Sequence, residues 1–97
     1  MLRIATACGV GMGSSLILRM HTEDVLKELG VDADVEAMDA PQAKAARVDL
    51  VLTSPSLVEV VSGGHAVVKP VSNYLDKTLI RAALVEFFDA EGIDYEG

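Results

Sequence analysis

The stretch ACGVGMGSSL, residues 7–16, contains Cys8, the single cysteine of this 97-residue chain. Every second residue after the cysteine is a glycine, and two serines close the run: Gly9, Gly11, Gly13, Ser14 and Ser15. The preceding residues 2–7, LRIATA, are rich in apolar and β-branched side chains and predict a short strand. The stretch therefore predicts a tight, glycine-rich connection that leaves a strand and enters a helix.

A helix is predicted from Ser14 to about Leu29. Its core-facing positions recur at intervals of four, three and four residues, at Leu18, Thr22, Val25 and Leu29. Ser14 or Ser15 is expected to be the N-cap, since a serine hydroxyl accepts a hydrogen bond from a free N–H of the first turn. Gly30 stands where a helix commonly ends on a glycine.

The rest of the chain alternates between predicted strands and predicted helices. Strands are predicted at 32–38, 49–54 and 66–71. Pro70 cannot donate to a strand ladder, so it is expected at a strand end or on an edge strand. Helices are predicted at 40–46 and 76–90, and a short helix or a turn at 55–64.

The last predicted helix is expected to begin at a cap formed by Asp76. One apolar stripe of this helix is predicted to face inward, formed by Leu79, Ala83 or Ala82, Glu86 and Phe87. The residues after it, 91–97, are expected to fray because they carry no periodic apolar pattern.

Alternating strands and helices without a hairpin signal indicate an α/β sandwich built on a parallel sheet. Hydrophobic residues make up 51% of the chain, which is enough for one core, and residues 1–97 are predicted to form a single domain. Only four residues are aromatic, two Tyr and two Phe, so the core is expected to be aliphatic.

Charge and cysteine content exclude several classes of function. The net charge of −7 argues against a nucleic-acid surface, which needs a basic patch. Apolar runs are short and broken by charge, so no segment is predicted to insert into a membrane, and no signal peptide is recognised. A lone cysteine forms neither an intramolecular disulfide nor a structural zinc site, and it suits the reducing cytoplasm. No metal and no organic cofactor is implied.

The position of Cys8 predicts a site for an anion of phosphate size. In open parallel sheets, ligands bind beyond the carboxyl ends of the strands, at a switch point of the topology. The glycines let backbone N–H groups turn inward, and the helix N-terminus adds free N–H groups and partial positive charge. The same field favours the thiolate of Cys8, so this arrangement predicts a cysteinyl-phosphate intermediate.

Other interpretations of this loop compete with the phosphate site. The simplest is a structural cysteine buried in a tight turn. A P-loop NTPase needs Gly-Lys-Ser/Thr, and no lysine lies between Cys8 and Ser15. A dinucleotide-binding fold needs Gly-x-Gly-x-x-Gly, whereas these glycines follow Gly-x-Gly-x-Gly.

A cysteine phosphatase of the low-molecular-weight type also carries its nucleophile after the first strand. Its loop is Cys-x5-Arg, but Ser14 stands at the arginine position, and the chain contains no Asp-Pro pair for a general acid. A loop without the arginine and the acid is expected to hold phosphocysteine without rapid hydrolysis. A phosphoryl relay needs this property.

With these motifs the chain resembles the enzyme IIB components of the bacterial phosphoenolpyruvate-dependent sugar phosphotransferase system, first the ascorbate type and then the galactitol type. The resemblance is strongest in CGVGMGSSLILRM, residues 8–20, and returns at DLVLTS, residues 49–54, and more faintly at VVKPVSNYLD, residues 67–76. It implies a four-stranded parallel sheet of order 2-1-3-4 flanked by helices, similar to the low-molecular-weight tyrosine phosphatases.

The resemblance also implies a reaction. Cys8 takes a phosphoryl group from the phosphohistidine of a IIA protein or domain and passes it to a sugar or sugar acid held by a membrane-embedded IIC transporter. The residues expected to wrap the phosphate, mostly through backbone N–H groups, are Gly9, Val10, Gly11, Met12, Gly13, Ser14 and Ser15. The alternative from another class is a redox- or anion-sensing module that uses the same thiol, and a phosphatase comes third.

A few further residues invite a role. With strand order 2-1-3-4, Thr53 and Ser54 end the third strand beside the Cys8 loop and are predicted to line the site, unless they form an ordinary turn before Pro55. Met12 is expected at the loop tip, where an exposed apolar side chain suits docking on a partner. His21 is expected to be a surface or half-buried side chain.

Overall fold

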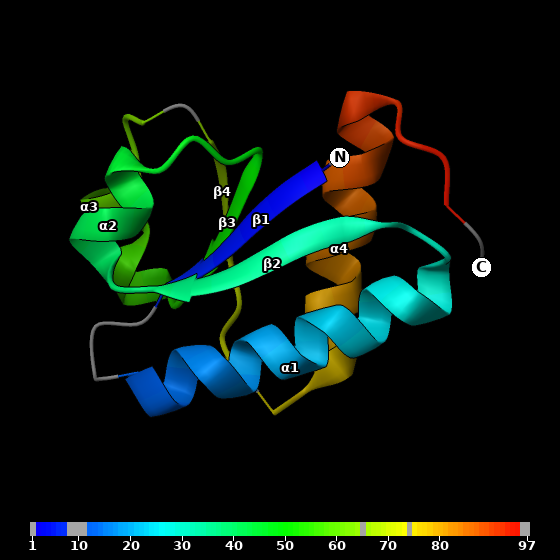
Figure 1. Cartoon of the computed structure of the whole chain (residues 1–97), viewed down its shortest axis with the longest axis horizontal. Helices are drawn as coiled ribbons and strands as arrows, with labels where there is room; N and C mark the ends of the chain where they lie inside the picture. Colours follow the sequence, from blue (N-terminus) through cyan, green and yellow to red (C-terminus); the bar gives the residue numbers. More distant parts are fainter. Residues whose placement is uncertain (1, 8–11, 65, 74, 96–97) are drawn as a thin grey trace.

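The computed structural model describes residues 2–7, 12–64, 66–73 and 75–95, with the side chains of the first helix described from Leu16 onward (Figure 1). Within these ranges the elements are β1 Leu2–Ala7, α1 Met12–Leu29, β2 Ala33–Met38, α2 Ala40–Ala45, β3 Leu50–Thr53, the 3₁₀ turn η1 Pro55–Leu57, α3 Val58–Val61, β4 Val67–Pro70 and α4 Lys77–Glu91. The strands and helices predicted from the sequence are all present, and the undecided stretch 55–64 forms η1 followed by α3.

The strands form one parallel sheet in the order β2-β1-β3-β4, as predicted. Figure 1 shows α1 and α4 on one face of this sheet and α2 and α3 on the other, which gives three layers. β3 is buried along its whole length because helices cover both of its faces, and this explains the apolar run of Leu50, Val51 and Leu52. The structure confirms the predicted α/β sandwich.

The larger core lies between the sheet and the layer of α1 and α4. Its largest side chains come from all of these elements: Ile4, Leu18, Leu29, Leu50, Leu52, Ile80, Leu84, Phe87 and Phe88. A smaller core under α2 and α3 contains Ala5, Ala7, Met38, Ala43, Val51 and Val61. Both phenylalanines are buried, with ring centroids 6.0 Å apart, so the otherwise aliphatic core contains both phenylalanine rings. Within the described ranges, no helix is long and apolar enough to cross a membrane.

The inward stripe predicted for α4 is partly wrong. The buried positions are Ile80, Ala83, Leu84, Phe87 and Phe88. Leu79 is 37% exposed, and Glu86 extends toward solvent, where its carboxylate pairs with Lys69 at 2.6 Å. The two adjacent phenylalanines both face the core, so the stripe is broader than one residue per turn and is centred one position later than predicted.

The predicted start of α1 is also wrong. α1 begins at Met12, so Ser14 and Ser15 stand inside its first turn and neither is its N-cap. The first four N–H groups of any helix lack intrahelical partners, so serines are tolerated throughout that turn and do not fix the cap position. The predicted end is confirmed, because Gly30 adopts a φ of 69° and Val31 N–H donates to the carbonyl of Leu26 at 3.0 Å.

The chain after α4 is more ordered than predicted up to residue 95, and residues 96–97 lie outside the described ranges. Ile93 and Tyr95 pack partly buried against the larger core, and the ring centroid of Tyr95 lies 5.8 Å from that of Phe88. Tyr95 Oη donates a hydrogen bond to a carboxylate oxygen of Asp89 at 3.0 Å. The expectation of fraying therefore fails for residues 93–95, which cover the end of α4.

Other predicted features are confirmed. Asp76 caps α4, since its carboxylate accepts a hydrogen bond from the N–H of Thr78 at 2.9 Å. Pro70 is the last residue of β4, which is an edge strand of the sheet.

Gly64 lies against the backbone carbonyl of Lys44, where a Cβ atom has no room, so this glycine lets the α3–β4 connection approach the end of α2.

Candidate functional site

The connection between β1 and α1 is where the sequence predicts the site. β1 ends at Ala7 and α1 begins at Met12. Four predicted site residues fall between them and lie outside the described ranges: Cys8, Gly9, Val10 and Gly11. For Met12, Gly13, Ser14 and Ser15 the structure describes the backbone as helical. The roles assigned to these eight residues stay predictions, and the structure adds what surrounds them.

β1 ends between the ends of two neighbouring strands. Ala7, the last residue of β1, is in register with Met38 of β2 on one side and with Thr53 of β3 on the other. α1 follows β1 on one face of the sheet, and η1 and α3 follow the neighbouring strand β3 on the opposite face (Figure 1). Connections that leave toward opposite faces open a crevice at the carboxyl edge, and this is the place where parallel sheets bind ligands.

Thr53 joins the two strand ends at this edge. Its side chain is fully buried, and its hydroxyl donates a hydrogen bond to the carbonyl of Ala7 at 3.0 Å. Ala7 directly precedes Cys8, so this bond fixes the last described residue before the predicted nucleophile. The bond depends on the register of β1 and β3, which the sequence pattern does not determine, so it was not predictable from the sequence.

Ser54 follows Thr53 at the same edge and is half-buried. Its hydroxyl lies 3.0 Å from the hydroxyl of Ser56 in η1. The structure thus brings both predicted site-lining residues beside the end of β1, with the Thr53 hydroxyl committed to backbone and the Ser54 hydroxyl within a serine pair. Whether either contacts a bound phosphate stays a prediction.

The first helix supplies backbone donors directly after the connection. The first-turn N–H groups of any α-helix have no intrahelical partner and give the helix N-terminus a partial positive charge. Since α1 starts four residues after Cys8, these donors are close to the cysteine along the chain. The arrangement suits an anion covalently attached to Cys8.

Acidic residues are absent from this part of the chain. The sequence contains 15 Asp and Glu residues, and the first of them is Glu23. Glu23 and the next acid, Asp24, both have cationic partners, at 3.6 Å from Arg19 Nε and 3.0 Å from Lys77 Nζ. The hydrogen bond and the charge of Lys77 hold the pKa of Asp24 below its ordinary value. This distribution, which is visible in the sequence, keeps carboxylates out of the chain segments directly before and after Cys8.

The histidines contribute no described group to the site. His21 is half-buried in α1, as predicted, and lies more than two turns from the helix start. His65 lies outside the described ranges. Among the described residues, no group of three or more His, Cys, Asp or Glu side chains is arranged to hold a metal ion.

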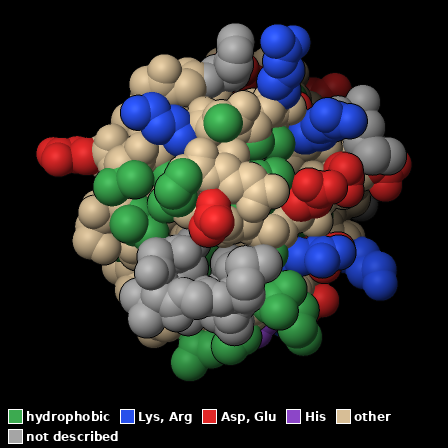
Figure 2. Space-filling model, turned by 60° about the vertical axis from the view of Figure 1, so that its left-hand side comes forward, with side chains coloured by type: hydrophobic (Ala, Val, Ile, Leu, Met, Phe, Trp, Pro, Cys, Tyr) green, Lys and Arg blue, Asp and Glu red, His purple; other side chains and the backbone are tan. Residues whose placement is uncertain are grey.

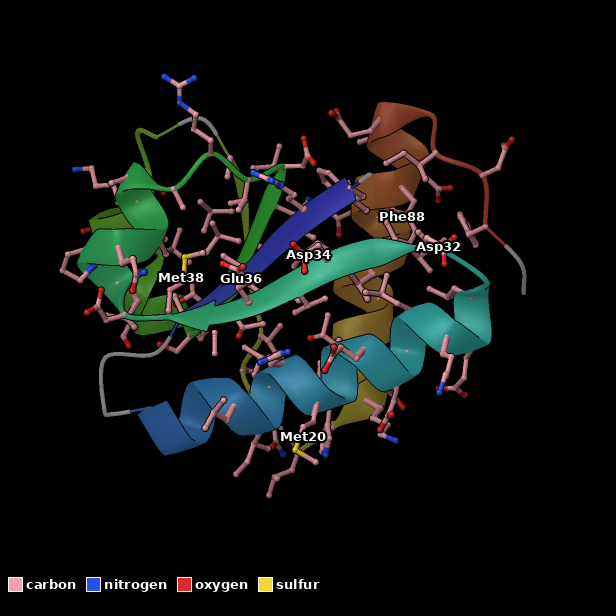
Figure 3. All side chains as sticks on the ribbon, viewed as in Figure 1. Met20, Asp32, Asp34, Glu36, Met38 and Phe88 are labelled. Carbon is pink, nitrogen blue, oxygen red and sulfur yellow. The ribbon has the colours of Figure 1, made fainter. Side chains whose placement is uncertain are left out.

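A hollow of about 220 Å³ lies beside β2, away from α1 and α4. It is lined by Arg3, Ile4, Asp34, Glu36, Met38, Ala46, Arg47 and Val48. Figure 3 shows Asp34, Glu36 and Met38 in succession along β2. The two carboxylates balance the two arginines of this hollow, so it presents no net charge to a phosphate. The carboxyl edge remains the better candidate site.

Comparison with known proteins identifies the family. A family model described as "PTS system, Lactose/Cellobiose specific IIB subunit" matches residues 3–86. An "Ascorbate-specific PTS system EIIB component" of Mycoplasma pneumoniae is 36% identical over 86 residues, which cover 86% of this chain and 90% of that protein.

A solved structure shows the same fold. It is the lactose-specific IIB component domain of the phosphoenolpyruvate:carbohydrate phosphotransferase system from Streptococcus pneumoniae. The TM-score is 0.59 at 14% sequence identity, and the match covers 90% of this chain and 97% of that one. IIB components are phosphotransferases that work with IIA and IIC partners on a sugar. The sequence match across residues 3–86 and the shared fold lead to one conclusion: the chain belongs to the lactose/cellobiose-specific IIB subunit family of the phosphotransferase system.

Proposed function

We propose that this chain is a phosphoryl carrier in which Cys8 is the phosphorylated residue. Its thiolate takes the phosphoryl group from a phosphohistidine of a IIA protein or domain and passes it to a substrate held by a IIC transporter. The observation that carries this proposal is the placement of Cys8 between the end of β1, at the switch point of the sheet, and the start of α1.

Two in-line displacements at phosphorus make up the proposed reaction. In the first, the sulfur of Cys8 attacks phosphorus, and the P–N bond breaks with its electron pair going to the imidazole nitrogen of the donor, which takes a proton. In the second, a substrate hydroxyl attacks phosphorus and gives up its proton to solvent, and the P–S bond breaks with its electron pair going to sulfur, which restores the thiolate. Backbone N–H groups of residues 9–15 would hold the phosphoryl oxygens in both steps.

The substrate class follows from the relatives and not from the described residues. The sequence relative is named for ascorbate, whereas the family model and the structural relative are named for lactose or cellobiose. The greater sequence similarity to the ascorbate-specific protein, 36% against 14%, favours a sugar acid of the ascorbate kind as substrate.

The test is the intact mass of the protein after incubation with phosphoenolpyruvate, the general phosphocarrier proteins and an ascorbate-type IIA protein. We expect one added phosphoryl group on the wild-type chain and none on Cys8→Ser. If the IIA protein is phosphorylated and the wild-type chain gains no mass, the carrier role fails for that donor.

The competing functions give different results in the same assay. A phosphatase would release inorganic phosphate and leave little phosphorylated protein, since its cysteinyl-phosphate hydrolyses. A redox sensor would gain oxygen or a disulfide-linked adduct at Cys8 under mild oxidation and would gain no phosphate. Stable mass addition that disappears only when IIC vesicles and substrate are supplied supports the carrier.

A further inference from the structure

The outer face of α1 changes character along the helix. In its first half, three large apolar side chains are exposed: Leu16 by 44%, Ile17 by 41% and Met20 by 61%. In its second half the exposed positions are charged: Glu23, Asp24, Lys27 and Glu28. A surface helix normally presents polar residues to water along its whole outer face. The exception is confined to the end of α1 that follows Cys8.

Leu75 extends this apolar surface from the segment before α4. Its side chain is 69% exposed, although it stands directly before the cap Asp76, where an apolar residue often packs on the fourth residue of the helix. That fourth residue, Ile80, is fully buried in the core. The ion pair of Lys77 with Asp24 brings the start of α4 alongside α1, one turn beyond Met20.

We define the α1 apolar patch by its four exposed side chains, which are those of Leu16, Ile17, Met20 and Leu75. Figure 3 shows Met20 on the side of α1 turned away from β2, and Figure 2 shows hydrophobic side chains gathered along the lower edge of the face that contains the carboxyl edge of the sheet. Met20 is eight residues from the start of α1, a rise of about 12 Å. A protein that covers the predicted cysteine site can therefore cover the patch as well.

We propose that the α1 apolar patch is the docking surface for the phosphohistidine-bearing donor, the IIA protein. The proposal rests on the proposed carrier function of Cys8. A patch of four side chains amounts to a few hundred Å², which is roughly the apolar centre of a small, transient interface and well below the area of a permanent dimer. A carrier that must release its donor after each transfer needs an interface of this size.

The distribution of charge around the α1 apolar patch favours the donor as its partner over the acceptor. The donor arrives with the phosphoryl dianion on its own surface, whereas the acceptor arrives with a sugar and finds the phosphoryl group already on the carrier. Residues 1–22 contain no carboxylate, in a chain of net charge −7. Beside the patch, the side chain of Arg19 is 42% exposed, and its Nε lies 3.6 Å from a carboxylate oxygen of Glu23. This surface attracts an anion-bearing partner.

The test measures the second-order rate of phosphorylation by a phosphorylated ascorbate-type IIA protein, followed by quenching and intact mass. The double variant Ile17→Glu/Met20→Glu places two acids in the patch, and Ile17→Lys/Met20→Lys places two bases at the same positions. The matched control is Val60→Glu, because Val60 of α3 is exposed to a similar degree, 46%. All of these side chains are exposed, so the thermal unfolding midpoints are expected to stay close to that of the wild type.

The expected result is a rate about tenfold lower or more for the glutamate pair, a smaller loss for the lysine pair and a change within about twofold for Val60→Glu. Phosphorylation of the glutamate pair at the wild-type rate overturns the proposal. So does normal phosphorylation combined with slow transfer to IIC vesicles, which would make the patch the acceptor surface. Loss of a wild-type dimer in the variants would assign the patch to a second copy. Failure of the wild type to accept phosphate contradicts the carrier function itself and is recognised by the absence of any mass gain.

Discussion

Thr53 shows how a single residue connects the fold with the site. Its buried hydroxyl donates to the carbonyl of Ala7, the residue before Cys8, and ties the ends of β1 and β3 together. Thr22 offers a matched comparison, since its hydroxyl is equally buried and donates to the carbonyl of Leu18 at 2.7 Å. The Leu18 carbonyl also lies within the regular hydrogen bonding of α1, so its bond to Thr22 is the more dispensable of the two.

We expect Thr53→Val to lower the free energy of unfolding by about 1–2 kcal/mol, because the variant keeps the shape and removes a buried hydrogen bond. Thr22→Val is expected to change it by less than about 0.5 kcal/mol. Denaturant unfolding of both variants measures the difference. Equal losses of unfolding free energy in the two variants would mean that the hydrogen bond from Thr53 to Ala7 stabilises the protein no more than the bond from Thr22 to Leu18 does.

At the scale of elements, α4 shows which face of a helix the protein buries. The stripe predicted from the sequence includes Leu79 and Glu86, whereas the structure buries Ile80, Leu84 and Phe88. The sequence of this helix is apolar on more than one side, so spacing alone does not choose the buried face. The choice is made by the sheet and by α1, which the helix must contact at the same time.

The neighbouring residues Ile80 and Leu79 give a direct test of that face. We expect Ile80→Ala to lower the free energy of unfolding by about 2–5 kcal/mol, since it leaves a cavity in the larger core. Leu79→Ala is expected to lower it by less than about 1 kcal/mol, because its side chain is partly in solvent already. A larger loss for Leu79→Ala than for Ile80→Ala would restore the stripe predicted from the sequence.

The segment after α4 carries a pH-sensitive contact. The hydrogen bond from Tyr95 to Asp89 raises the pKa of Tyr95 above its ordinary value of 10.0, because the neutral phenol is the donor. A raised pKa in the folded state means that this contact stabilises the protein fully below about pH 10. The stabilisation is lost as the pH rises through the pKa of the folded protein.

Tyrosinate absorbance against pH in a Tyr74→Phe background measures this pKa. Asp89→Ala is expected to bring the pKa of Tyr95 back toward 10.0, whereas Glu91→Ala, which removes an acid not bonded to Tyr95, is expected to leave it raised. An unchanged pKa in Asp89→Ala would contradict the contact.

At the scale of the whole molecule, the alternation of strands and helices predicted the class of fold, and the family resemblance supplied the strand order. Local patterns were sufficient for this because the apolar strand β3 is buried on both faces and helices such as α1 and α4 are delimited by residues such as Gly30 and Asp76. Features that depend on contacts between distant segments were not predictable. The bond of Thr53 to Ala7 requires the register of two strands, and the packing of Tyr95 on Phe88 requires the path of the chain after α4.

The sequence predicts where the candidate site lies along the chain, but it does not predict the geometry of that site. The cysteine, the glycine spacing and the following helix mark the carboxyl end of β1 in the sequence, and the strand order places that end at the switch point of the sheet. The α1 apolar patch was not predicted, because the exposure of Leu16, Ile17 and Met20 depends on which side of α1 meets the sheet. The absence of acidic residues before Glu23 is visible in the sequence and strengthens the prediction.

Peptide mapping of the phosphorylated protein tests most directly whether Cys8 is a transient carrier of phosphate. The chain is charged from phosphoenolpyruvate through the general carriers and a IIA protein, freed of donor, and digested before and after addition of IIC vesicles and substrate. A carrier role of Cys8 predicts one phosphoryl group on the peptide that contains Cys8, stable until IIC and substrate are added together and then lost to the substrate. A phosphoryl group on any other peptide, or one on Cys8 that water removes without an acceptor, would contradict it.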